Sequence, residues 1–127
     1  MKQVFDPDRP IYIQIKEIIE NQIINEQLKE GDQAPSTNQL VNFYKVNHIT
    51  VSKGVNQLVD AGILYKKRGI GMFVEQGARE KLITERRKTF IDDYIVTLIR
   101  EANKLGFSET DMISLIREVG ERETNEH

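Results

Sequence analysis

Isoleucine recurs every three or four positions near the start of the chain, and this spacing places its side chains on one side of an α-helix. The members of this stripe are Ile11, Ile15, Ile18, Ile19 and Ile23. Pro10 suits the first turn of such a helix, because an N–H at that position would have no partner. Gly31 suits the left-handed position after a helix end. The pattern predicts a helix over about residues 10 to 27 that the run Lys29–Asp32 stops.

Two shorter helices are predicted next. Ser36 and Gln39 have the spacing of a capping box, which indicates a helix over about residues 36 to 44. Asn47 can cap a further helix that ends at Ala61-Gly62. The apolar side of this helix consists of Thr50, Val51, Val55, Leu58 and Val59. Only Lys45 and Val46 join the two helices, so the chain must turn sharply, as in a helix-turn-helix.

The pattern changes after Gly62 to two short β-prone runs, Ile63–Lys67 and Met72–Glu75. The segment Arg68–Gly71 separates them, and its glycines fit the turn of a β-hairpin. Three helices followed by a hairpin make a winged helix-turn-helix. We therefore expect a fold that is mainly α with a small β-hairpin, in which residues 1–76 form the winged helix-turn-helix domain.

Helical spacing returns after Gly77. Apolar positions between Leu82 and Leu105 predict one long helix of about 25 residues that ends at Gly106. Ser108–Asp111 can open a last helix, and the polar residues 120–127 are expected to fray. Residues 77–127 are thus predicted to be a two-helix appendage.

Composition narrows the possible chemistry. A chain of 127 residues has room for one domain and an appendage. The absence of cysteine excludes disulfides and thiolate chemistry, and two histidines leave little for an imidazole metal cluster, so we expect no cofactor and no metal. No apolar run is long enough to span a bilayer, and Met1–Asp6 has no apolar signal core, which favours the cytoplasm.

The net charge of −2 is distributed unevenly along the chain. Residues 34–74 contain five Lys or Arg against one acidic residue, Asp60, whereas both flanks are acidic. Because a partner responds to local charge, a basic segment that coincides with the helix-turn-helix and the hairpin points to double-stranded DNA. A solvated basic face is the alternative.

The DNA major groove admits an α-helix whose N-terminal side chains meet base edges. In the helix capped by Asn47, the first two turns contain His48, Ile49, Thr50, Ser52 and Lys53. The hydroxyl groups of Thr50 and Ser52 can donate hydrogen bonds, and Lys53 can neutralise a phosphate. His48 can donate to a base or a phosphate. Asn47 is a candidate contact as well as a cap.

The run Lys66-Lys67-Arg68 joins three positive charges to the turn at Gly69, which is slim enough for close approach to a phosphate or to the minor groove. We expect Lys66, Arg68 and Gly69 to contact DNA. The sequence Gly69-Ile70-Gly71 lacks the third glycine of a dinucleotide fingerprint and lies between strands, so nucleotide binding is disfavoured.

Together these features resemble the N-terminal winged-helix domain of the GntR family of bacterial transcription regulators over residues 10–74. The likeness rests on Pro10–Ile15, Leu28–Asp32, Pro35-Ser36 with Leu40, Thr50-Val51, Leu58–Leu64 and Arg68–Val74. The C-terminal region resembles the YtrA-like subfamily in Leu82, Arg86, Arg87, Phe90 and Ile91. This second resemblance implies a small two-helix appendage that dimerises, and repression near transporter genes.

The family resemblance carries DNA contact over to Ser36, Thr50, Lys53, Arg68 and Gly69. The family often has arginine two residues after the serine of its Pro-Ser motif, near the start of the recognition helix, and shortly after its Thr-Val pair. Asn38, His48 and Ser52 occupy these positions here. Three usual arginine contacts are therefore absent, and the operator sequence does not follow by analogy.

The apolar stripe of the C-terminal half is too long for one short helix to cover, so a second subunit is its expected cover. Phe90, Tyr94 and Leu98 follow one another at four-residue steps and are the candidate anchors of a homodimer. Asp92 and Asp93 have the chemistry of a metal site or an acid–base pair, but no further ligand is grouped with them, which favours a solvated face.

The sequence favours a dimeric, sequence-specific DNA-binding regulator, a repressor that acts on a pseudo-palindromic operator. The alternative is a protein-interaction module that keeps the winged-helix shape without using DNA. A small enzyme is disfavoured, because no nucleophile, base and orienting group fall together. No membrane association is expected, and the existence of a small-molecule effector is left open.

Overall fold

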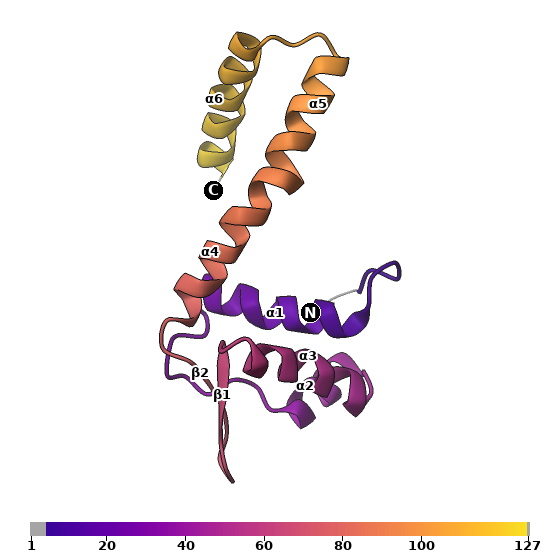
Figure 1. The fold of residues 1–127 in the computed structure, drawn as a ribbon, viewed down its shortest axis with the longest axis vertical. Coiled ribbons are helices and arrows are strands. Elements are labelled where there is room, and N and C mark those ends of the chain that lie inside the picture. The colour runs from indigo at the N-terminus through magenta and orange to yellow at the C-terminus, as the bar shows by residue number, and fades with distance from the viewer. Residues whose placement is uncertain (1–4, 127) are drawn as a thin grey trace. The chain divides into compact units, whose positions relative to one another are not determined.

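The computed structural model of the chain describes residues 5–126 and divides into two compact units. The first extends to Glu85 and the second begins at Arg86. In Figure 1 the first unit carries the labels α1 to β2, and the second carries α5 and α6. The helix α4 contributes residues to both units.

The first unit is a winged helix-turn-helix, as the sequence predicts. Its elements are α1 (Ile11–Ile24), α2 (Thr37–Tyr44), α3 (His48–Asp60), β1 (Leu64–Lys67), β2 (Gly71–Val74) and the beginning of α4 (Ala78–Phe90). The two strands pair antiparallel, with Leu64 opposite Val74 and Lys67 opposite Gly71. The largest fully buried side chains are Ile15, Ile19, Ile23, Leu58, Leu64, Val51, Val55 and Val74. One core therefore joins α1, α3 and the hairpin.

The contact between α1 and α3 is unusually close at Gly54. A Cβ atom placed on Gly54 would lie 2.5 Å from the backbone oxygen of Tyr12, a distance that real Cβ atoms do not reach. Val51 and Val55 flank this point on the buried side of α3. Glycine is thus required here because the two helix backbones meet without an intervening side chain.

The first helix ends earlier than the sequence predicts. It stops at Ile24, and Glu26, with φ +62°, is left-handed directly after the helix end. Gly31 is also left-handed, as predicted, with φ +86°, but it lies further along in the connection to α2. The N–H groups of Gln27 and Leu28 then both donate to the carbonyl of Gln22. This turn allows Leu28 to pack against the core, which the isoleucine spacing alone does not reveal.

Gly31 begins a short segment, residues 31–34, that pairs with β2. The Gly31 N–H donates to the Val74 carbonyl at 2.9 Å, the Val74 N–H donates to Asp32, and the Ala34 N–H donates to Met72 at 2.8 Å. The wing is therefore held by backbone bonds to the connection between α1 and α2. The segment has no alternating apolar pattern, so the residues themselves do not indicate this pairing.

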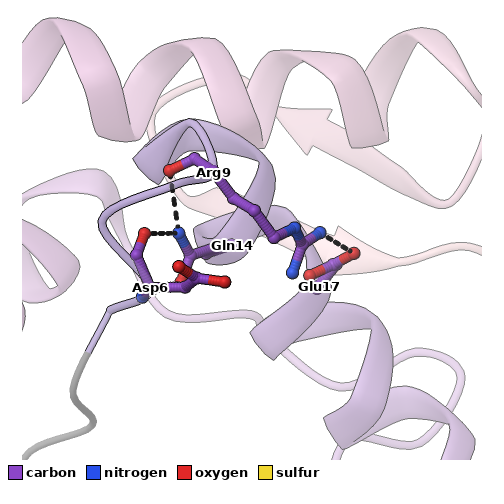
Figure 2. A network of polar contacts seen from close by, with 4 residues as sticks. All are labelled: Asp6, Arg9, Gln14 and Glu17. Carbon is purple, nitrogen blue, oxygen red and sulfur yellow. Dashed lines mark hydrogen bonds and ion pairs between the residues drawn. The ribbon is translucent and has the colours of Figure 1, made fainter.

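The residues before α1 are fastened by Gln14, a buried polar side chain. Its amide nitrogen donates to the backbone oxygens of Asp6 (2.8 Å) and Arg9 (3.0 Å), and its amide oxygen accepts from the Asp6 N–H, as Figure 2 shows in part. Arg9 also pairs with Glu17 at 2.7 Å. Gln14 thereby gives hydrogen-bond partners to backbone groups of the segment that precedes the helix.

The second unit contains the end of α4, a π-helical segment at Ile91–Ile95, α5 (Val96–Lys104) and α6 (Glu109–Glu126). The expected single long helix is thus interrupted, since the N–H of Val96 donates to Ile91 five residues back. The chain turns at Gly106, which has φ +77° (Figure 1).

The last helix begins at a reciprocal cap. The Ser108 N–H donates to the carboxylate of Asp111 at 2.9 Å, and the Asp111 N–H donates to the Ser108 hydroxyl at 3.1 Å. The backbone and hydroxyl bonds from Ser108 lower the pKa of Asp111. The expected fraying from residue 120 is wrong for the described residues, because α6 continues to Glu126. Its last turns are rich in Glu and Arg, which favour helix, and Thr124 bonds back to the Gly120 carbonyl.

The first unit extends beyond residue 76, where the sequence suggested a boundary. Ala78 and Leu82 belong to its buried core, although both lie on α4. The change from strand to helix at residue 77 marks a change of element, and the compact unit continues past it.

Replacing Gly54 with alanine should destabilise the chain. The added methyl group forces α1 and α3 apart, and overpacking of this kind costs about 1–3 kcal/mol, of which alanine's better helix propensity offsets roughly 0.5–1 kcal/mol. The free energy of unfolding in urea should therefore fall by about 1–2 kcal/mol. Gly120→Ala is the matched control, because a Cβ there meets nothing within 4 Å. Equal or greater stability of Gly54→Ala would contradict the close contact.

Candidate nucleic-acid interface

The two helices of the helix-turn-helix begin at side-chain caps, as predicted. The Ser36 hydroxyl accepts from the Gln39 N–H at 3.0 Å, and the Gln39 side chain accepts from the Ser36 N–H at 2.8 Å. The Asn47 amide oxygen accepts from the Thr50 N–H at 2.8 Å. Lys45, with φ +57°, makes the sharp turn between the helices. Ser36 and Asn47 thus set where α2 and α3 start, whatever else they contact.

The start of α3 presents polar side chains away from the core. Val51 is buried, while Asn47, His48 and Lys53 are exposed and Ser52 is partly exposed. The Ser52 hydroxyl lies 3.3 Å from Nδ1 of His48, one helical turn away. Together these two side chains offer hydrogen-bond groups on one face of α3. Asn38, also exposed, lies at the start of α2.

Lys53 is held in place by an aromatic ring from another helix. Its ammonium group lies 4.1 Å from the centroid of the Tyr12 ring. A cation over an aromatic face is attracted by the ring's quadrupole, which reduces the freedom of the lysine side chain. The sequence does not reveal this pair, since 41 positions separate the partners and no spacing rule connects them.

The wing tip is open to solvent on its outer side. Gly69 has φ +77°, and a Cβ there would meet nothing within 4 Å. The Ile70 N–H closes the turn by donating to the Lys67 carbonyl at 3.0 Å. From outside the hairpin, the Gln33 amide donates to the Ile70 carbonyl at 3.1 Å. The hydrogen bond from Gln33 therefore stabilises the turn, and Gly69, which has no side chain, leaves room for a phosphate or the minor groove to approach closely.

The three cations of the wing differ in their surroundings. The Lys67 ammonium lies 4.6 Å from the centroid of the Phe73 ring. The side chains of Lys66 and Arg68 are exposed and make no hydrogen bond or ion pair within residues 5–126. These two side chains are therefore available to phosphates, while Lys67 covers the aromatic side of the hairpin.

Other kinds of site find little support in the part of the chain that the structure describes. Within residues 5–126, no three His, Cys, Asp or Glu side chains gather as metal ligands, and Asp92 and Asp93 are exposed on the π-helical segment. Across the same residues, no helix combines the length and apolar character needed to cross a membrane.

A helix-turn-helix with a basic wing defines a class of DNA-binding proteins, and the comparisons agree. Residues 11–74 match the model of the bacterial regulatory proteins of the gntR family. The HTH-type transcriptional repressor YtrA from Bacillus subtilis is 30% identical over 110 residues, which cover 87% of this chain and 84% of that protein. The chain belongs to the GntR family.

Solved structures support the same assignment. A GntR-family regulator from Bacteroides thetaiotaomicron is similar with a TM-score of 0.73 and 30% identity, covering 89% of this chain and 98% of the other. The DNA-binding domain of AraR in complex with operator ORE1 is similar with a TM-score of 0.51 and 29% identity, covering 58% and 93%. The chain is a DNA-binding transcription regulator of this family, and it is not an enzyme.

Removing charge from the wing should weaken binding to all DNA sequences nearly equally. Each lost phosphate contact reduces the slope of log affinity against log salt by about 0.9. We expect this reduction for Arg68→Ala and for Lys66→Ala in a salt titration. Lys104→Ala is the control, because that exposed lysine pairs with Glu101 in the second unit. An altered operator preference at an unchanged salt slope would show that Arg68 contacts bases instead.

Proposed function

We propose that the protein is a homodimeric repressor in the cytoplasm that binds a pseudo-palindromic operator, with one α3 in the major groove of each half-site. The observation that carries the dimer is the apolar surface of the second unit. The exposed large apolar residues of this unit include Phe90, Ile91, Tyr94, Leu98, Ile99, Leu105, Phe107, Ile113, Ile116 and Val119.

This surface has too little cover within its own unit. Within residues 86–126 only Ala102 is buried, and α6 contributes no buried residue. The rings of Phe90 and Tyr94 contact each other at a tilt of 38°, with 5.4 Å between their centroids, yet half or more of each residue remains exposed. Burying a large apolar side chain is worth roughly 1.5–3 kcal/mol, so mutual cover by two copies is strongly favoured.

A dimer would also give the DNA-binding unit its specificity. Two α3 helices related by a two-fold axis contact half-sites about 34–36 Å apart, and joining them raises the effective concentration of the second. In this proposal the DNA contacts are Ser36, Asn38, Asn47, His48, Thr50, Ser52, Lys53, Lys66, Arg68 and Gly69. The relatives include several named repressors, which supports repression. The YtrA-like resemblance adds a location near transporter genes.

The competing function is a protein-interaction module that does not use DNA. The basic charge of residues 34–74 favours DNA over this alternative, because the exposed Lys66 and Arg68 have no acidic partner within the described residues. Steep weakening with added salt is the signature of phosphate neutralisation. Binding that is indifferent to salt would support the protein partner.

Disrupting the apolar surface should give a monomer that binds its operator poorly. In Phe90→Asp/Leu98→Asp, two carboxylates would have to be buried in the interface, so sedimentation should show one chain. Specific binding should be mostly lost, because a monomer contacts one half-site. The winged-helix unit should keep its fold, since neither residue lies in its core.

The matched control is Thr97→Asp/Asn103→Asp, which adds the same charge at two exposed polar positions of α5. It should remain dimeric and bind normally. A Phe90→Asp/Leu98→Asp protein that stayed dimeric, or a monomer with undiminished operator affinity, would defeat the proposal.

A further inference from the structure

Ile49 stands out among the apolar residues of the DNA-binding unit. Its side chain is 81% exposed, more than any other large hydrophobic residue among those described. It is the second residue of α3, directly after His48 and before the partly buried Thr50. The core takes its side chains from Val51, Val55 and Leu58, so Ile49 has no part in holding α3 to the domain.

The surroundings of Ile49 along the helix are polar. Residues three, four and seven positions on share its side of α3, and these are Ser52, Lys53 and Asn56. An apolar surface that binds another protein is normally a contiguous patch. A single aliphatic side chain among hydroxyl, ammonium and amide groups instead fits a ligand with one small apolar group on a polar, anionic surface.

The DNA major groove presents one such group. Thymine carries a C5-methyl group there, while the other groups that base pairs expose in this groove are hydrogen-bond donors and acceptors. Ile49 is β-branched and has one strongly preferred χ1 rotamer in a helix, so its methyl groups are already fixed in direction before DNA binds. Lys53, held over Tyr12, supplies positive charge one turn further along.

We infer that Ile49 contacts the methyl group of a thymine and thereby selects an A·T pair at one position of each half-site. This inference rests on the proposed function, since it requires α3 to enter the major groove. Ile49 then shares the discrimination between bases with Asn38, His48 and Ser52. Those three residues offer hydrogen-bond groups at the positions where the resemblance to the family leads one to expect arginine.

The test removes the methyl group from the DNA. After an operator is selected from a random DNA pool, each thymine is replaced in turn by deoxyuridine, which pairs identically but lacks the methyl. Replacement of the contacted thymine in one half-site should weaken binding about fourfold, which corresponds to about 0.8 kcal/mol for one buried carbon group. Replacement in both half-sites should weaken it about fifteenfold.

The protein arm of the experiment uses Ile49→Ala. This variant should bind thymine and deoxyuridine operators equally, because the groups that touch the methyl are gone. Ile70→Ala is the control, since Ile70 is a similarly exposed isoleucine on the wing, at 63%. It should keep the fourfold difference between the two operators, whatever its overall affinity.

The outcomes separate the inference from the proposed function. Specific binding that no deoxyuridine replacement weakens, or a sensitive thymine that remains equally sensitive in Ile49→Ala, overturns the inference and leaves the regulator intact. A selected operator without a thymine preference in its half-sites also overturns it. Failure of the selection to yield any operator contradicts the proposed function itself.

Discussion

The approach of α1 to α3 at Gly54 determines how the DNA-binding surface is presented. With no side chain between them, the backbone of α3 rests on the carbonyl of Tyr12. The adjacent residue, Lys53, is consequently placed over the ring of the same tyrosine. The contact at Gly54 therefore fixes both the position of α3 against α1 and the place of the Lys53 ammonium group. The direction of the polar face at the start of α3 depends on this position, because Val51 and Val55 are buried together only while α1 and α3 stay close.

Much of the first unit could be predicted from local sequence, and the failures share a physical cause. The caps at Ser36 and Asn47 follow from spacing of three residues, and the hairpin follows from its glycines and β-prone runs. The pairing of residues 31–34 with β2, the brace from Gln33 and the ring under Lys53 join distant positions. Periodicity describes one element at a time, so it does not reveal which elements meet.

The second unit shows a different limit. Its apolar spacing correctly indicates helix, but the same spacing serves a helix covered by its own chain and one covered by another copy. In the structure Tyr94 remains 65% exposed although its ring contacts that of Phe90, and the proposed dimer rests on this exposure, which spacing does not reveal. The π-helical turn at Ile91–Ile95 also cannot be predicted from the sequence, because such a turn consists of ordinary residues and hardly changes the spacing of the apolar positions.

That π-helical turn has a consequence for how this region tolerates changes in length. It holds one residue more than a regular α-helix would over the same rise, so losing one residue from Ile91–Ile95 would yield an unbroken, well-bonded helix. Because the wider π-helical turn spreads its five residues over about the rotation of four α-helical ones, Leu98 and Ile99 would keep their direction relative to Phe90. Losing one residue inside the regular turns of α5 would instead rotate every later side chain by about 100°. The π-helical turn is therefore a place where the chain can lose a residue without displacing the apolar side of the helix.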